Sequence, residues 1–406
     1  MHIYELAIKI SSIFNDKAKH WVHGRKDIFN KLRSAIGNTK NVTWFHAASL
    51  GEFEQGRPVI EAFKKKYPEK KILLTFFSPS GYEPRKDYPG VDFVFYLPVD
   101  TLKNAKKFLS IVNPETAIFI KYEFWFNYLK FLRHDSVPTF LISGIFRENQ
   151  HFFKWYGKWF RKQLSSFTHF FVQNEKSEKL LHSIGFPNVS ISGDTRFDRV
   201  ADIAKQNKEY PLIAQFAKEN HIILAGSSWS QDETFLPGLF NLGIPNLKII
   251  IAPHEIKKER ISEILTLFKD RNPITYSYAS AENINDSDVL VIDGMGFLSS
   301  LYQYCKIAII GGGFGKGIHN ILEAVTFGKP VIFGPTYDKF NEAVELIHRG
   351  GAFSFSEQKE LNTKIKKLML DESFYSIASR TCESYIKENT GATKQIMACL
   401  SKYQPN

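Results

Sequence analysis

The hydrophobic positions of this chain form short, nearly continuous apolar runs that alternate with longer amphipathic stretches such as 56–68 and 101–114. Such runs are typical of strands buried on both faces of a parallel sheet, and the stretches between them have helical spacing. We therefore expect an α/β fold. The predicted strands are 41–47, 70–76, 93–98, 116–120, 138–143, 169–173, 189–193, 221–227, 247–253, 288–293, 306–312 and 329–334.

The pattern restarts after the polar segment 193–211, and a chain of 406 residues is too long for one core. We expect two doubly wound, Rossmann-like domains, at 1–200 and 201–406. In such sheets ligands bind at the carboxyl ends of the strands.

Charge and cysteine content narrow the class of protein. Lys and Arg number 53 against 42 Asp and Glu, a formal charge of +11, which favours anionic partners such as phosphorylated substrates, acidic membrane surfaces or nucleic acid. The 3 cysteines are too few and too widely spaced for a disulfide framework or a zinc site, and they fit a reducing compartment such as the cytoplasm.

The N-terminus has an amphipathic pattern. No apolar run reaches the ~20 residues that cross a bilayer, and no secretory signal is present. Two interpretations stay open: a helix lying in a membrane interface, or a helix packed on its own domain. The apolar positions at helical spacing are Ile3, Leu6, Ile10, Ile13 and Phe14.

Glycine is concentrated in "GGGFGKGIHNILEAVTFGKPVIFGP", residues 311–335. The glycines of 311–317 follow a predicted strand and precede a helix expected to begin near His319–Asn320 and to end near Gly328. Glycine lets the backbone approach a ligand closely, and a helix N-terminus offers N–H groups to an anion. We interpret the loop as a phosphate site; a tight turn beneath a packed helix is the alternative.

Two familiar phosphate motifs do not fit this loop. A dinucleotide fingerprint needs glycine at Lys316 or Ile318, and a Walker A loop ending at Lys316 needs Ser or Thr at Gly317. Glu323, three residues after Asn320, either caps the helix or accepts the hydroxyls of a ribose.

Two glutamates follow predicted strands in the first half. Glu52, in "FHAASLGEFEQGRP", lies in the first turn of a helix expected to begin near Gly51, where the helix dipole favours negative charge. Glu123 directly follows another strand, two residues after Lys121. Both are candidate site residues, with capping as the alternative for Glu52. We interpret His46, which precedes the turn, as structural.

Further candidates follow strands in the second half. Ser227 and Ser228 could donate to a phosphate, and Pro253 and His254 close another strand. Each signal is weak by itself, and their common position after strands is the stronger observation.

Taken in order, the motifs resemble those of 3-deoxy-D-manno-octulosonic acid (Kdo) transferases from about Val42 to Phe340. The resemblance is carried by "WFHAASLGEFEQGRPVIEAF", "SPSGYE", "YLPVDT", "IFIKYEFWFNYL", "GDTRFD", "AGSSWSQDE" and the glycine stretch. It implies a GT-B glycosyltransferase whose two domains face a cleft. The donor would be CMP-Kdo, held mainly by the second domain. The acceptor would be the phosphorylated, acylated lipid A precursor, docked at the first.

The resemblance also assigns residues. Glu52 would be the catalytic base of an inverting transfer, and CMP contacts map onto Pro253–His254, Met295–Phe297 and Asn320–Glu323. The residues expected on the acceptor side, besides Glu52, are Ser49, Gly51, Arg57, Lys121 and Glu123. Those expected on the donor side are Ser227, Ser228, Pro253, His254, Met295, Gly296, Phe297, Gly312, Gly313, Gly317, Asn320, Ile321, Leu322 and Glu323.

Two positions depart from the family pattern. His254 stands where many members have arginine, and Phe297 stands where many have glutamate. These changes affect nucleotide binding and leave the base and the glycine loop intact.

Cofactor, location and alternatives complete the expectations. We expect no cofactor or metal, because the Asp-x-Asp candidate at 286–288 precedes its strand. The expected location is the cytoplasmic face of the inner membrane, peripheral or anchored by the N-terminus. The alternatives are a GT-B enzyme of envelope synthesis that uses a UDP-sugar and, from the charge alone, a nucleic-acid binder. Because the sequence lacks a clustered Lys/Arg stripe with stacking aromatics, we expect no nucleic-acid partner.

Overall fold

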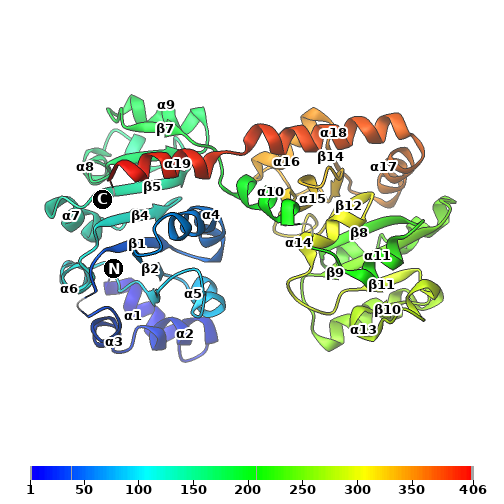
Figure 1. The fold of residues 1–406 in the computed structure, drawn as a ribbon, viewed down its shortest axis with the longest axis horizontal. Coiled ribbons are helices and arrows are strands. Elements are labelled where there is room, and N and C mark those ends of the chain that lie inside the picture. Colours follow the sequence, from blue (N-terminus) through cyan, green and yellow to red (C-terminus); the bar gives the residue numbers. More distant parts are fainter. Residues whose placement is uncertain (1, 38, 207, 404–406) are drawn as a thin grey trace. The chain divides into compact units, whose positions relative to one another are not determined.

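The computed structural model describes residues 2–37, 39–206 and 208–403, which fold into two compact units (Figure 1). Unit 1 comprises Met1–Asp198 and Thr390–Asn406, and unit 2 comprises Arg199–Asn389. The predicted second domain, 201–406, is wrong at its C-terminal end, because the segment from Thr390 onward belongs to unit 1. The cause is visible in α19 (Ala392–Leu400), whose Ile396, Met397 and Leu400 are buried in the unit 1 core.

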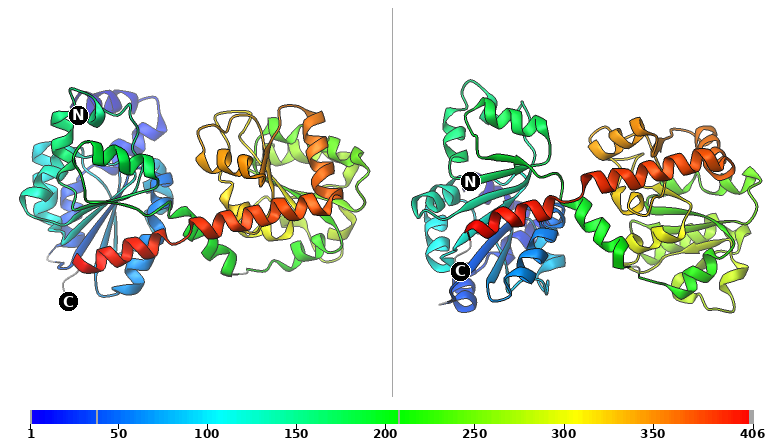
Figure 2. Two further views of the ribbon diagram at one scale, coloured as in Figure 1. Left: turned by 90° about the horizontal axis from the view of Figure 1, so that it is seen from above. Right: turned by 45° about the horizontal axis from the view of Figure 1, so that its top comes forward.

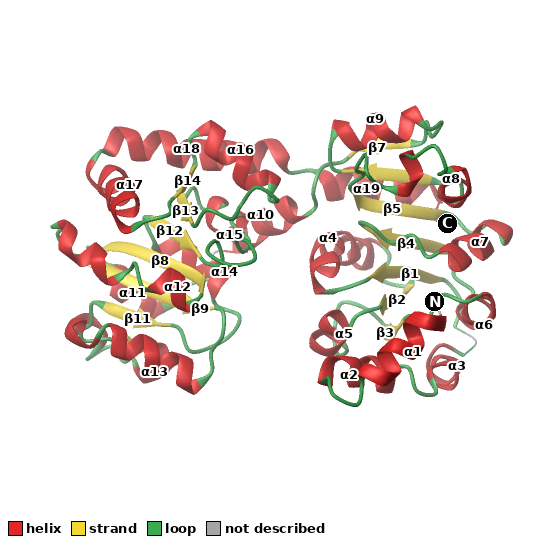
Figure 3. Ribbon diagram, turned by 180° about the vertical axis from the view of Figure 1, so that it is seen from behind, coloured by secondary structure: helices red, strands yellow, loops and turns green. Residues whose placement is uncertain are grey.

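Unit 1 contains a seven-stranded sheet in the order β3-β2-β1-β4-β5-β6-β7, with every neighbouring pair parallel. Figure 3 shows its helices on both faces of the strands. The strands are β1 (Val42–Ala47), β2 (Lys71–Phe76), β3 (Phe93–Tyr96), β4 (Thr116–Ile120), β5 (Thr139–Gly144), β6 (His169–Val172) and β7 (Val189–Ile191).

The core of unit 1 explains why its strands read as continuous apolar runs. All six residues of β1 are buried, and successive side chains enter opposite layers. Trp44 packs in the cluster that contains Phe108 and Tyr128, whereas Phe45 packs in the cluster that contains Phe63. The helices are α1 (His2–Ser11), α2 (Asp16–Gly24), α3 (Ile28–Ile36), α4 (Leu50–Lys66), α5 (Pro79–Arg85), α6 (Leu102–Val112), α7 (Phe126–His134), α8 (Lys158–Leu164) and α9 (Glu175–Ser183), with the 3-10 turn η1 (His151–Phe153).

Unit 2 repeats the architecture, with parallel strands in the order β10-β11-β9-β8-β12-β13-β14. Its strands are β8 (His221–Ser228), β9 (Leu247–Pro253), β10 (Ile274–Thr275), β11 (Val289–Val291), β12 (Ile307–Ile310), β13 (Val331–Phe333) and β14 (Ala352–Ser354). The two parallel sheets confirm the predicted α/β class. The short strands β10 and β14 were not predicted.

The helices of unit 2 differ from expectation at one place. The helix after the glycine loop is a single turn, α15 (Leu322–Val325), and it begins later than His319–Asn320. Asn320 delays it, because its side-chain oxygen accepts from the N–H of Leu322. The other helices are α11 (Pro211–Ala217), α12 (Ser230–Glu233), α13 (Lys258–Leu267), α14 (Leu298–Leu301), α16 (Asn341–Arg349), α17 (Gln358–Leu370) and α18 (Glu372–Asn389).

The start of α10 (Arg196–Gln206) contacts the start of α19 in unit 1. The helix α10 carries the chain out of unit 1, and α18 is followed by α19 on its return (Figure 2). Within unit 1, the carboxylate of Asp198 accepts from the N–H groups of Gly391 and Thr393, each at 2.6 Å. Asp198 thereby caps α19.

Candidate active site

The predicted base, Glu52, lies in the first turn of α4, directly after β1. Ser49 is the N-cap residue of this helix, and its hydroxyl donates to the Glu52 carboxylate. Glu52 is half-buried and Gly51 is exposed.

Glu123 lies at the end of a buried chain of hydrogen bonds. Its Oε2 is 3.2 Å from His46 Nε2 and also accepts from Trp125 Nε1. His46 Nδ1 is 2.8 Å from the hydroxyl oxygen of Thr75, which also accepts from Trp44 Nε1 at 2.8 Å. The imidazole of His46 therefore lies between the Thr75 hydroxyl and the Glu123 carboxylate. His46 is therefore more than packing, because it orients Glu123.

Tyr122 lies near the carboxylate of Glu52 and the guanidinium of Arg147. Burial raises the pKa of its hydroxyl, the Arg147 guanidinium opposes this, and the Glu52 carboxylate adds to the rise. Arg147 donates to the Tyr122 hydroxyl at 3.2 Å, and Lys121 Nζ lies 5.2 Å from the Tyr122 ring centroid. The carboxyl edge of the unit 1 sheet thus combines carboxylates and cations.

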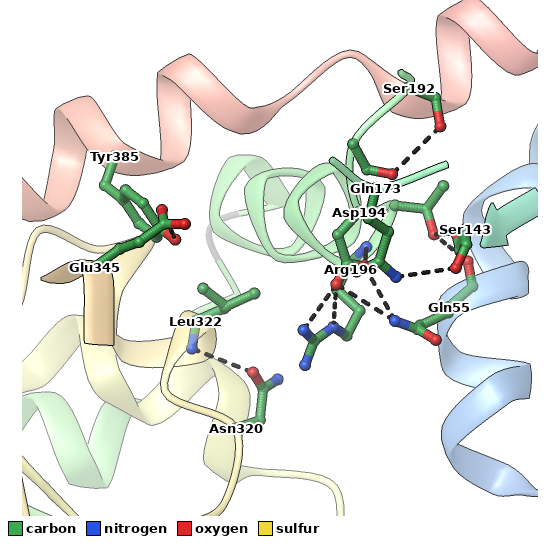
Figure 4. Close-up of polar contacts among 12 residues, drawn as sticks. Gln55, Ser143, Gln173, Ser192, Asp194, Arg196, Asn320, Leu322, Glu345 and Tyr385 are labelled. Atoms are coloured by element: carbon green, nitrogen blue, oxygen red, sulfur yellow. Dashed lines mark hydrogen bonds and ion pairs between the residues drawn. The ribbon is translucent and has the colours of Figure 1, made fainter. Parts of the chain in front are cut away.

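The "GDTRFD" motif fastens α4 within unit 1 (Figure 4). Asp194 Oδ2 accepts from Gln55 Nε2 at 3.3 Å and from Arg196 Nε at 2.8 Å. The Thr195 hydroxyl donates to the Gln55 carbonyl and lies 3.0 Å from the Ser143 hydroxyl. Since Gln55 is one turn after Glu52, these contacts fix the helix that carries Glu52.

Arg57 faces a different partner. On the next turn of α4, its Nε is 2.6 Å from Glu61 Oε1, which also accepts from the Tyr88 hydroxyl at 2.7 Å. Its predicted acceptor role stays a prediction.

In unit 2, the glycine loop packs closely on its own backbone. A Cβ on Gly311 would lie 2.2 Å from the Ser227 carbonyl oxygen, and one on Gly313 would lie 2.6 Å from Gly334 N. Gly312 and Gly317 have φ of +91° and +135°, which favour glycine. The tight-turn interpretation thus accounts for these glycines, and phosphate binding stays a prediction.

The carboxylate of Asp232 holds the loop in place. Its Oδ2 accepts from the N–H groups of Gly312 and Trp229, each at 2.9 Å. Burial raises the pKa of Asp232, and these two hydrogen bonds oppose the rise. The N–H of Gly312 therefore donates to a side chain of the protein, whereas the sequence predicts that Gly312 contacts the donor.

The two serines differ. Ser228 is buried and its hydroxyl donates to Glu233 Oε1 at 2.7 Å, so an intramolecular bond occupies it. Ser227 is half-buried, with φ of +52°. A second carboxylate oxygen of Glu233 pairs with Arg260.

Three rings stack beside the loop. His254, after the buried Pro253, lies with its ring centroid 4.6 Å from Trp229 and 4.5 Å from His319. Trp229 Nε1 donates to His319 Nε2 at 3.0 Å, so that nitrogen carries no hydrogen. Burial, and then the charge of His254, lower the pKa of His319 to about 4.

Glu323 is held from two sides. Its Oε1 accepts from Asn320 Nδ2 at 3.1 Å, while Ile321 and Leu322 are buried. Burial raises the pKa of Glu323, and the Asn320 hydrogen bond and the Arg199 charge oppose the rise. Figure 4 shows Asn320 turned toward the N–H of Leu322.

The segment after β11 is partly exposed. The Met295 side chain is 83% exposed and Gly296 has φ of +86°. Phe297 packs 5.5 Å from Tyr210 and 5.2 Å from Tyr276, between ring centroids. Phe297 therefore belongs to an aromatic cluster with these two tyrosines.

No three His, Cys, Asp or Glu side chains gather as a metal site within the described ranges.

The sequence analysis missed several residues at the carboxyl edges of the two sheets. A tyrosine beside a candidate glutamate was a usable signal for Tyr122, whereas Thr75 and Asp232 reach their partners only through strand order. The residues missed are Thr75, Tyr122, Arg147, Arg199, Trp229, Asp232 and His319.

A family model described as 3-Deoxy-D-manno-octulosonic-acid transferase (kdotransferase) matches residues 24–199. A 3-deoxy-D-manno-octulosonic acid transferase of Aquifex aeolicus is 29% identical over 344 residues, covering 83% of this chain and 88% of that protein. One of Haemophilus influenzae is 26% identical over 381 residues, covering 89% and 86%. These matches support the Kdo transferase family for this chain.

Solved structures show that the chain has the GT-B fold. MurG of Acinetobacter baumannii matches with a TM-score of 0.55 and 11% identity, over 89% of this chain and 99% of that chain. A putative UDP-N-acetylglucosamine 2-epimerase from Listeria monocytogenes matches with a TM-score of 0.60 and 12% identity, over 90% and 97%. At these identities the likeness concerns the fold alone.

Proposed function

We propose that the protein transfers Kdo from CMP-Kdo to the phosphorylated, acylated lipid A precursor of lipopolysaccharide. The observation that carries the proposal is the combination of similarity to Kdo transferases with Glu52 at the start of α4, after the central strand β1. Relatives aligned over most of their own length support the same activity.

In the proposed reaction Glu52 accepts the proton of the acceptor hydroxyl. At the same time the oxygen of that hydroxyl bonds to the anomeric carbon of Kdo. The bond from that carbon to the phosphate oxygen breaks, and CMP leaves with the electron pair. Attack on the face opposite the leaving group inverts the configuration, as in inverting glycosidases. The Ser49 hydrogen bond holds the carboxylate in place.

Donor binding is proposed for unit 2, on the residues around the glycine loop. His254 follows β9, Asn320 and Glu323 follow β12, and all three present polar atoms at the carboxyl edge of one sheet. Strand ends of this kind are the usual nucleotide sites of doubly wound sheets. Metal independence is part of the proposal.

The test is mass analysis of the lipid product after incubation with CMP-Kdo and the lipid A precursor. We expect the addition of Kdo in the presence of a chelator. A calorimetric titration should show tighter binding of CMP than of UDP. Tighter binding of UDP, with no Kdo product, would assign the protein to the UDP-sugar alternative.

We also propose that the protein works peripherally at an anionic membrane surface. The described residues include no helix long and apolar enough to span a bilayer. Ile10, Ile13 and Phe14, at the end of α1 and just beyond it, are 58%, 72% and 89% exposed. The side chains of Ile3 and Leu6 lie outside the described part of the chain. The cytoplasmic side of the inner membrane follows from the substrates of the proposed reaction.

A further inference from the structure

A basic and aromatic segment follows β5 and has had no role so far. Residues 149–174 contain no Asp or Glu but four Lys or Arg. Trp155, Tyr156 and Trp159 are 93%, 48% and 56% exposed. Exposed aromatic rings next to cations are typical of surfaces that meet a lipid interface.

Beneath this segment is a cavity of about 600 Å³, which we call the aromatic pocket. Cavities of about 300–1,000 Å³ with mainly apolar and aromatic walls are the usual sites for small ligands. The side chains that line it include Tyr122, Trp125, Phe126, Asn149, Phe152 and Phe160.

The walls of the pocket are rings packed edge to face. Phe126 lies 4.9 Å from Trp159 and 5.9 Å from Phe160, between ring centroids. Glu123 also lines the pocket, but its Oε2 faces His46 and Trp125. Most of the lining therefore favours an apolar ligand.

Positive charge lies at the same place. Arg147 is exposed and donates to the hydroxyl of Tyr122, which lines the pocket. An apolar cavity beside an exposed guanidinium matches a ligand with an alkyl chain and a phosphate, since arginine binds phosphate through several N–H groups.

We propose that the aromatic pocket takes one acyl chain of the acceptor, with a phosphate of the same molecule at Arg147. This inference rests on the proposed function and adds a subsite to it. The pocket shares Tyr122 and Glu123 with the edge that carries Glu52, so a chain bound there tethers the acceptor beside the base.

The test uses the full chain without donor and a series of octyl, decyl and dodecyl phosphate below micelle formation. Affinity measured by calorimetry should rise by about fourfold per methylene. Asn149→Trp, an exposed position on the rim, should plug the pocket and flatten this dependence. Phe126→Ser should flatten it by removing a wall. Arg147→Gln should weaken all three ligands by a similar factor and keep the slope.

The matched control is Tyr278→Ser, which removes an 81% exposed aromatic ring in unit 2 and should leave the series unchanged. A slope that survives both Asn149→Trp and Phe126→Ser overturns the proposal. So does an equal loss in Tyr278→Ser.

Two further measurements separate this inference from the proposed function. If Kdo transfer occurs, Asn149→Trp should lower kcat/KM for the acylated acceptor about tenfold or more and spare a deacylated acceptor. Equal kcat/KM losses for both acceptors would overturn the subsite alone. Chain-length-dependent binding without any Kdo transfer would overturn the proposed function and leave the subsite standing.

Discussion

His46 Nε2 lies 3.2 Å from Glu123 Oε2, and both side chains are buried. The same oxygen accepts from Trp125 Nε1, so two donors converge on one carboxylate oxygen. The amide oxygen of a glutamine could accept from both, whereas alanine would leave both donors buried without an acceptor.

We therefore expect Glu123→Gln to keep unit 1 folded and Glu123→Ala to lower its free energy of unfolding by about 1–3 kcal/mol. Urea unfolding followed by tryptophan fluorescence measures this. Equal stability of the two variants would show that the network is not maintained in solution. Glu123→Gln should also reduce turnover, through acceptor positioning.

Glu52→Gln keeps the size of the side chain and removes its basicity. Under the proposed function it should lower turnover by about 10²–10⁴-fold, the usual contribution of a positioned base. CMP affinity, measured by calorimetry, should stay unchanged because the change lies in unit 1. If Glu52→Gln keeps near wild-type turnover while Glu123→Gln loses it, Glu123 is the base and Glu52 positions the acceptor.

Gly311 and Gly315 form a matched pair for the two interpretations of the loop. A Cβ on Gly311 meets backbone at 2.2 Å, whereas one on Gly315 meets its nearest atom at 3.6 Å. Gly311→Ala should destabilise unit 2 by about 1–3 kcal/mol, as overpacking does. Gly315→Ala should leave stability unchanged. Loss of CMP binding in stable Gly315→Ala would favour a ligand role for the loop.

The pKa of His319 sets a pH dependence. Because its folded value of about 4 lies below the ordinary histidine value of about 6.5, the unfolded state binds more protons between these two pH values. The stability of unit 2 should therefore fall as pH decreases through that window. Trp229→Phe removes the donor to Nε2 and should raise the His319 pKa, measured by NMR titration.

Membrane attachment can be tested at the end of α1. Ile13→Ser with Phe14→Ser should reduce flotation with anionic vesicles by about tenfold or more, because each side chain contributes about 1.5–3 kcal/mol when buried. Ile377→Ser, at a 54% exposed position in unit 2, is the control. Unchanged flotation at low salt would contradict the peripheral assignment.

The sequence predicted what depends on local pattern. The long buried strands such as β1 and β8, and the start of α4, were read from apolar runs and a cap. It missed β14, whose three residues Ala352–Ser354 are too short to give a pattern. It also placed the start of the helix after the glycine loop too early, because Asn320 caps the backbone locally.

The sequence predicted individual residues of the candidate site but not the hydrogen bonds between them. Glu123 was singled out because it follows a strand. Its bond to His46, and through it to Thr75, joins three different strand regions and depends on sheet order. In the same way, the hydrogen bond between Gly312 and Asp232 could not be inferred, because the donor is a backbone N–H and the sequence does not indicate its acceptor.

The position of α19 bears on how the chain folds during synthesis. Ile396, Met397 and Leu400 complete a layer of the unit 1 core, yet they emerge from the ribosome after every residue of unit 2. Unit 2 is one continuous stretch and can close its sheet first. The part of α4 that α19 covers therefore stays exposed through most of translation. A chain stopped at 389 should aggregate through that part of α4, while the isolated stretch 199–389 should remain soluble.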